Sequence, residues 1–352
     1  MNRRAFLTGL GSLGAGAAIG AALWQRHRVS HRANAASTAP ARTVPASPRT
    51  GRALVATARR PELFNKDAKP DVRGLRINTD LVHQMVQESL AAALGTKNAS
   101  DAWKELFSPR DVVGIKINCL GGRMISSHPA IVNGIIQGLR TAGVPDNNII
   151  VWDRFSRELA DAGFSVNATG RGVKCFGTDA PGYGYTDEPI QHRSVGSCFS
   201  TILASVCSAI VSVPVLKDHD IAGVTLNLKN FFGAIQKPSI YHGNRCDPFI
   251  ADLYAHPLIK DKVRLTICDA LVGVFDRGPG YTEDGSWQYA GIIVSTDPVA
   301  IDRVCTQIIE TKRRESGKPS LKDAGREPTH IHTAAQLGLG TDDPDKIDVV
   351  EA

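Results

Sequence analysis

Short apolar runs alternate with longer amphipathic stretches over most of the chain. Runs rich in Val and Ile predict strands near residues 111–118, 148–153, 208–216, 223–229, 263–268 and 290–295. Apolar residues at helical spacing predict helices near 79–94, 128–143, 248–258 and 298–312. Strands that alternate with helices favour an α/β fold with a mainly parallel sheet and helices on both faces, arranged as one large domain or two packed lobes.

Polar residues follow four of these predicted strands. In a parallel sheet, ligands bind beyond the carboxyl ends of the strands. The residues at these ends are Asn118, Asp153, the run from Lys217 to His219, and Asp269. One polar residue at a strand end is usually part of a turn or a cap. Four such ends at one edge of a sheet indicate a site.

Two predicted strands alternate in a way that places polar side chains on one face. Lys116 and Asn118 share a face of the first strand, as do Asn227 and Lys229 in the stretch 223–229. The alternative reading is the solvent-facing side of an antiparallel strand.

Combined with Lys217 and His219, the pattern predicts an anion pocket. Lysine supplies charge, amides orient an oxyanion, and histidine titrates near neutral pH. In this hypothesis Lys217 and His219 are the catalytic residues. The ligand-binding residues are Lys116, Asn118, Asn227, Lys229 and Asn230.

A variant of this hypothesis adds a divalent metal. His242 lies in a polar, glycine-containing loop, and mixed histidine and carboxylate ligands suit zinc, iron, nickel or manganese. The candidate ligands are His219, His242, Asp153 and Asp269. His330 and His332 are two residues apart, which suits neither one helical face nor chelation from a helix, so the sequence places them at the surface.

The N-terminus has the layout of a twin-arginine export signal. Arg3 and Arg4 precede an uncharged run over residues 8–24, and an Ala-Asn-Ala sequence ending at Ala35 offers a cleavage site. We therefore expect residues 1–35 to be a signal peptide, the twin-arginine translocase to be a partner during export, and the mature protein to be periplasmic or otherwise extracytoplasmic. The alternative is a retained membrane anchor over residues 8–24.

The next segment differs in composition from the rest. Residues 36–70 are rich in Ala, Pro, Ser, Thr and Arg, a composition that buries little apolar surface and predicts a disordered tether. Residues 71–352 are expected to form the α/β domain.

Charge and cysteine usage narrow the classes of function. The formal net charge is +6, but residues 1–60 hold ten arginines and no acidic residue, so the remainder is net negative. A nucleic-acid-binding protein carries its basic excess on the folded domain, so we expect no nucleic-acid partner. Seven cysteines occur without a C-x-x-C spacing, so there is no intrinsic iron–sulfur motif.

Four motifs carry a resemblance to a known family. Gly114–Asn118, Val213–His219, Gly223–Gly233 and Ser295–Asp302 resemble, in the same order, the "domain of unknown function 362" family, over most of residues 110–340. The resemblance implies a prokaryotic α/β protein of unassigned activity. Some members carry a ferredoxin-like iron–sulfur segment, which this chain lacks.

Two classes of function follow from the sequence. The first is an enzyme that acts on a small anionic molecule, with or without a metal. The second is a binding or cofactor-carrying protein that captures an anion without chemistry. A histidine among the lysines favours the enzyme, because capture alone needs no titrating group.

Overall fold

One large sheet forms the centre of the structure. The computed structural model describes residues 51–71 and 73–352; the predicted signal peptide, residues 1–35, lies outside them. The strands run in the order β12-β1-β11-β10-β7-β2-β3-β4, and β8 joins β10 and β9. Their bounds are β1 (Ala53–Arg59), β2 (Val113–Lys116), β3 (Ile149–Asp153), β4 (Lys174–Gly177), β7 (Ala209–Ser212), β8 (Val215–His219), β9 (Gly223–Thr225), β10 (Val263–Val274), β11 (Ser286–Ser295) and β12 (Ile347–Glu351).

Most neighbouring strands in this sheet are parallel. β7 pairs parallel with β10 and β2, β2 with β3, and β3 with β4. The exceptions are β11, which is antiparallel to β1 and β10, and the short β8–β9 pair. A separate hairpin joins β5 (Ile190–His192) and β6 (Val195–Ser197). The predicted α/β class with a mainly parallel sheet is confirmed.

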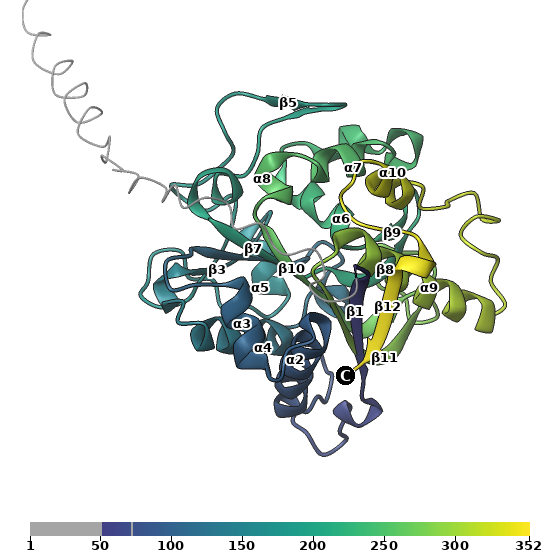
Figure 1. Cartoon of the computed structure of the whole chain (residues 1–352), viewed down its shortest axis with the longest axis horizontal. Helices are drawn as coiled ribbons and strands as arrows, with labels where there is room; N and C mark the ends of the chain where they lie inside the picture. The colour runs from purple at the N-terminus through teal and green to yellow at the C-terminus, as the bar shows by residue number, and fades with distance from the viewer. Residues whose placement is uncertain (1–50, 72) are drawn as a thin grey trace, which may run out of the picture. The chain divides into compact units, whose positions relative to one another are not determined.

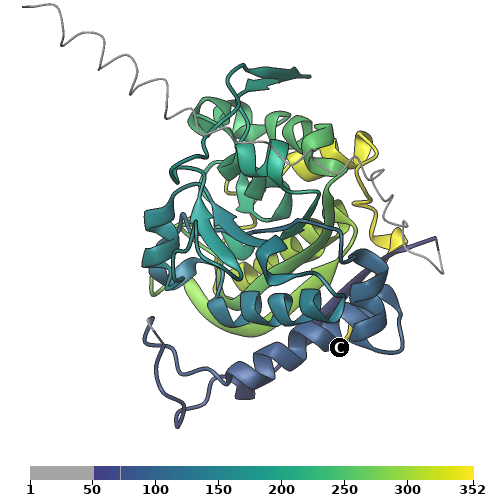
Figure 2. The same cartoon turned by 90° about the vertical axis from the view of Figure 1, so that its left-hand side faces the viewer.

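Helices cover both faces of the sheet (Figure 1 and Figure 2). Period-2 alternation divides each strand between two cores: Ile149 and Val151 pack with one set of helices, and Ile150 and Trp152 with the other. The first set is α2 (Thr79–Leu94), α3 (Ala99–Leu106) and α4 (Pro129–Thr141). The second includes α7 (Phe249–Tyr254), α8 (Pro257–Lys260), α9 (Pro298–Glu315) and α10 (His330–Gln336). The short helix α5 (Ser156–Asp161) follows β3.

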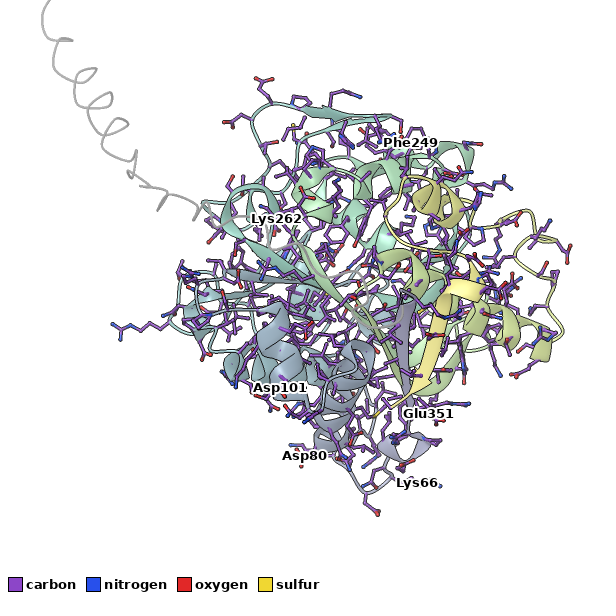
Figure 3. The ribbon with its side chains drawn as sticks, viewed as in Figure 1. Lys66, Asp80, Asp101, Phe249, Lys262 and Glu351 are labelled. Carbon is purple, nitrogen blue, oxygen red and sulfur yellow. The ribbon has the colours of Figure 1, made fainter. Side chains whose placement is uncertain are left out.

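The predicted tether extends too far. Residues 53–59 form β1, which pairs with β11 on one side and with β12 on the other, up to Glu351 (Figure 3). Val55, Ala56 and Ala58 are buried in the strand. Composition alone suggested disorder, but partner strands from distant parts of the chain satisfy the backbone of this segment. Residues 36–50 of the predicted tether lie outside the described residues.

The predicted strand over 223–229 is also wrong in its second half. β9 ends at Thr225, and Asn227–Asn230 form the short helix α6. The carboxylate of Asp302 in α9 accepts hydrogen bonds from the backbone amides of Asn227 (2.8 Å) and Leu228 (2.9 Å). These amides have no partner inside a helix, and a buried acceptor from another element stabilises the helical turn.

Lys262, labelled in Figure 3, precedes β10 and donates a hydrogen bond to the carbonyl oxygen of Leu203 (2.6 Å).

Across residues 51–71 and 73–352, no helix combines the length and apolar character needed to cross a membrane.

Candidate functional site

The sheet changes its direction of growth between β2 and β7. From β2 the chain adds β3 and then β4 on one side, and later places β7 on the other side of β2. In open α/β sheets, ligands bind at such a switch point, beyond the carboxyl ends of the strands. Asn230 lies there, because its amide nitrogen donates to the carbonyl of Lys116, which ends β2 (3.2 Å), and to the hydroxyl of Ser212, which ends β7 (3.1 Å).

Lys116 and Asp153 form a buried ion pair next to Asn230. Nζ of Lys116 lies 2.7 Å from Oδ1 of Asp153, and the other carboxylate oxygen accepts from the backbone amide of Cys119 (2.7 Å). Nζ also donates to the carbonyl of Ile117 (2.7 Å) and to Oδ1 of Asn230 (3.4 Å). Because its charge and all three protons already have partners, Lys116 supports the site rather than offering a free cation.

Lys217 and Asn118 contact each other next to this ion pair. Nζ of Lys217 donates to Oδ1 of Asn118 (2.8 Å), and the amide nitrogen of Asn118 donates to Oδ1 of Asn230 (3.3 Å). The backbone at Gly121 lies against the same ammonium, since a Cβ there would come within 3.0 Å of Nζ. At Gly233 a Cβ would lie 2.9 Å from Oδ1 of Asp153. Both glycines allow the chain to approach the charged groups closely.

The side chains of β8 alternate between two faces: one carries residues of the site, and the other carries a residue that anchors the strand. Lys217 and His219 share one face, and Asp218 lies on the other. Asp218 accepts from Arg326 (2.6 Å) and from the backbone amide of Gly278 (2.7 Å). These contacts hold the strand that presents Lys217 and His219.

His219 is a neutral hydrogen-bond donor. Its Nδ1 accepts from the backbone amides of Ile221 (3.0 Å) and Ala222 (3.2 Å), which favours the tautomer with the ring proton on Nε2. Burial, and then the charge of Lys229, lowers the pKa of His219 to about 2. The Asp220 carboxylate lies 2.9 Å from the same Nδ1, a contact that favours the tautomer with the proton on Nδ1, because a carboxylate oxygen only accepts.

Lys229 lies beside two further histidines, His242 and His330. Its Nζ lies 3.3 Å from Nε2 of His242, whose Nδ1 lies 3.1 Å from the carbonyl of Pro238. The His219 and His242 rings are 5.7 Å apart between centroids. His330, in α10, is fully buried, and neither ring nitrogen has a hydrogen-bond partner. Burial and the charge of Lys229 lower the pKa of His330 to about 3.

These residues form what we call the lysine–histidine cluster: Lys217, His219, Lys229, His242 and His330. Burial lowers the pKa of both Lys217 and Lys229 to about 8. Among the ion pairs of residues 51–71 and 73–352, none involves Lys217 or Lys229. The cluster therefore places two lysines without a carboxylate partner beside three neutral imidazoles.

The sequence missed one member of the cluster. His330 was expected at the surface, but α10 packs against α7 and α9, which buries it beside Lys229. No local pattern could reveal this placement, because the residues around His330 come from distant segments. His332, by contrast, is exposed, as expected, and lies 2.8 Å from Asp342.

Asn227 lies apart from the cluster. Its amide nitrogen donates to the hydroxyl of Tyr254 (3.3 Å) and to the carbonyl of Pro298 (3.4 Å). The predicted shared face with Lys229 depended on a strand, and the helical turn of α6 rotates the two side chains apart.

The four proposed metal ligands are not assembled. Asp269 accepts from the backbone amides of His128 (2.6 Å) and Leu271 (3.0 Å), and Asp153 is paired with Lys116. In the part of the chain that the structure describes, no group of three or more His, Cys, Asp or Glu side chains could hold a metal ion. The predicted metal site, His219 and His242 with Asp153 and Asp269, is therefore wrong.

Residues 113–307, more than half of the chain, match the family described as "Domain of unknown function (DUF362)". The chain belongs to this family. The match begins at β2 and ends in α9, so it includes every member of the lysine–histidine cluster except His330. DUF362 carries no assigned activity in its description.

Comparison with known proteins adds no activity. No curated protein sequence matches this chain. A crystal structure of a Thermotoga maritima protein from a structural genomics consortium is 11% identical, with a TM-score of 0.42. The alignment covers 68% of this chain and 59% of that protein.

Proposed function

We propose that the lysine–histidine cluster binds the negatively charged group of a small molecule. The observation that carries this proposal is the burial of Lys217 and Lys229 without carboxylate partners. Two like charges in a poorly solvated region repel each other and lose hydration. A bound anion offsets both costs, as a protein carboxylate would.

The cluster also has groups suited to proton transfer. A lysine with a pKa of about 8 exchanges a proton near neutral pH, which suits a general acid or base. With its ring proton on Nε2, His219 supplies a donor for developing negative charge, and Asn118 orients Lys217. In this proposal the lysines exchange the proton, in place of His219, because the imidazole stays neutral.

A binding protein without chemistry is the second candidate. The low pKa values of His219 and His330 favour it, because neither imidazole titrates near pH 7. Incubation with small carboxylates in deuterated water distinguishes the two candidates. Solvent deuterium bound to carbon in the recovered ligand means that a C–H proton was removed and replaced, which identifies an enzyme, and a ligand without it that binds at one equivalent identifies a carrier.

Replacing both lysines tests the anion site itself. In Lys217→Met with Lys229→Met, we expect binding of acetate and inorganic phosphate to fall at least 100-fold by titration calorimetry. The melting temperature should stay the same or rise, because two poorly solvated charges are removed. Lys104→Met is the matched control, since Lys104 is exposed on α3. Unchanged binding by the double variant, or a variant that only unfolds, would sink the proposal.

We also propose export of the folded chain by the twin-arginine pathway, from the sequence of residues 1–35. Lysine in place of Arg3 and Arg4 should leave the precursor in the cytoplasm, measured by cell fractionation. Equal periplasmic amounts of both proteins would reject this assignment.

A further inference from the structure

Large aliphatic side chains are exposed on the chain segments that carry or contact the buried charges. Leu120 is 65% exposed, Ile240 63% and Ile221 38%. In the described residues the exposed large hydrophobics are Leu120, Val166, Ile221, Ile240, Tyr281 and Val349. Half of this set lies within two positions along the chain of a residue of the lysine–histidine cluster or of one that contacts it. We call Leu120, Ile221 and Ile240 the aliphatic rim.

Each rim residue is tied to a cluster residue by a short stretch of chain. Leu120 precedes Gly121, whose backbone lies against Nζ of Lys217. The backbone amide of Ile221 donates to His219 (3.0 Å). Ile240 lies in the turn Pro238–Tyr241, two residues before His242. Since neighbouring Cα atoms are about 3.8 Å apart, each rim residue lies within roughly two such steps of a residue that contacts the cluster.

This arrangement reverses the usual order of polar and apolar groups. Charge is normally exposed and aliphatic surface buried, whereas here two lysines are buried and three aliphatic side chains contact water. A ligand with a charged end and an apolar body would pair with both layers. Apolar side chains with a few polar groups that fix orientation are typical of small-molecule sites.

We propose that the ligand is an amphiphilic anion, a small carboxylate with a medium-length aliphatic chain. This inference rests on the proposed function. The carboxylate binds Lys217 and Lys229, and the chain covers the aliphatic rim. The full burial of Lys217 favours a small molecule over a membrane or protein surface, because an extended surface cannot approach an ammonium that solvent does not reach.

Comparing octanoate with acetate distinguishes the contribution of the aliphatic rim from that of the lysines. Both have the same charged group, and calorimetric titration of the full-length chain at one ionic strength compares them. Burial of part of the octanoate chain should make it bind at least 10-fold more tightly than acetate. Equal affinities would overturn the inference while leaving the proposed function intact. Binding of neither probe would reject the proposed function itself.

Rim variants locate the aliphatic contact. Leu120→Ser with Ile240→Ser should weaken octanoate binding about 10-fold and leave acetate binding unchanged. Val166→Ser is the matched control, because Val166 is exposed but contributes nothing to the cluster. A rim variant that loses both probes equally contradicts the inference. Rim-dependent binding of the wild type to phosphatidylglycerol vesicles, without preference for octanoate, would assign the rim to membranes and also overturn it.

Discussion

Asp153→Ala is expected to lower the free energy of unfolding by about 3–5 kcal/mol, because it leaves the buried ammonium of Lys116 without its carboxylate. It also removes the acceptor of the Cys119 backbone amide. Chemical denaturation at pH 7 measures the loss. The result would show that Lys116 and Asp153 support the site, whereas the sequence suggested Lys116 as an anion ligand.

Two further variants control this experiment. Asp146→Ala breaks an ion pair with Arg140 of the same length, 2.7 Å, but at the surface, and should cost less than about 1 kcal/mol. Asp153→Leu with Lys116→Met replaces the buried pair by apolar groups and should recover part of the stability. A cost for Asp153→Ala no larger than that for Asp146→Ala would contradict the structural role.

Alkaline pH should stabilise the protein through Lys217 and Lys229. Their pKa values fall from 10.5 to about 8 on folding, so between pH 8 and 10.5 the unfolded chain binds more protons than the folded one. The free energy of unfolding therefore rises with pH in this window, by on the order of 3 kcal/mol for each lysine. The measurement is a series of denaturant titrations between pH 7 and 10.5.

The informative quantity is the difference in the free energy of unfolding between the wild type and the double variant, Lys217→Met with Lys229→Met. Other groups titrate in the same range, since burial raises the pKa of Cys119, Cys207 and Cys246, which acts in the opposite direction. Cys207 interacts with neither lysine and cancels in the comparison, whereas Cys119 and Cys246 interact electrostatically with Lys217 and Lys229 and cancel only in part. The variant should be more stable at pH 7 and lose its advantage by pH 10.5. Parallel stability curves would show that neither lysine is perturbed.

Local patterns predicted most of the helices and the central strands. The prediction for residues 79–94 agrees with α2, where Asn78 caps the helix and Gly95 ends it in a left-handed conformation. Asp297 caps α9 by accepting from the backbone amides of Val299 and Ala300. The first and last residues of these helices depend on nearby residues, so the sequence alone reveals them.

Features that depend on distant partners were missed. β1 was assigned to the tether, because its pairing strands are encoded more than 200 residues later. Asn227–Asn230 looked like a strand by alternation, but Asp302 from α9 makes it a helix. The same limit applies to the site: the sequence grouped Lys217, His219 and Lys229, but it could not distinguish the paired Lys116 from the unpaired lysines or find His330.

The pairing of β1 with β12 has a consequence for synthesis on the ribosome. Ala53 to Thr57 align with Ile347 to Glu351, and Arg52 contacts Asp348 across 296 positions (2.7 Å). Contacts between such distant segments close a long loop, which slows folding. Until β11 emerges, β1 lacks both neighbours, and until β12 emerges it keeps an open edge that can pair with another nascent chain. Chaperone binding should therefore persist until residues 347–351 have paired with β1.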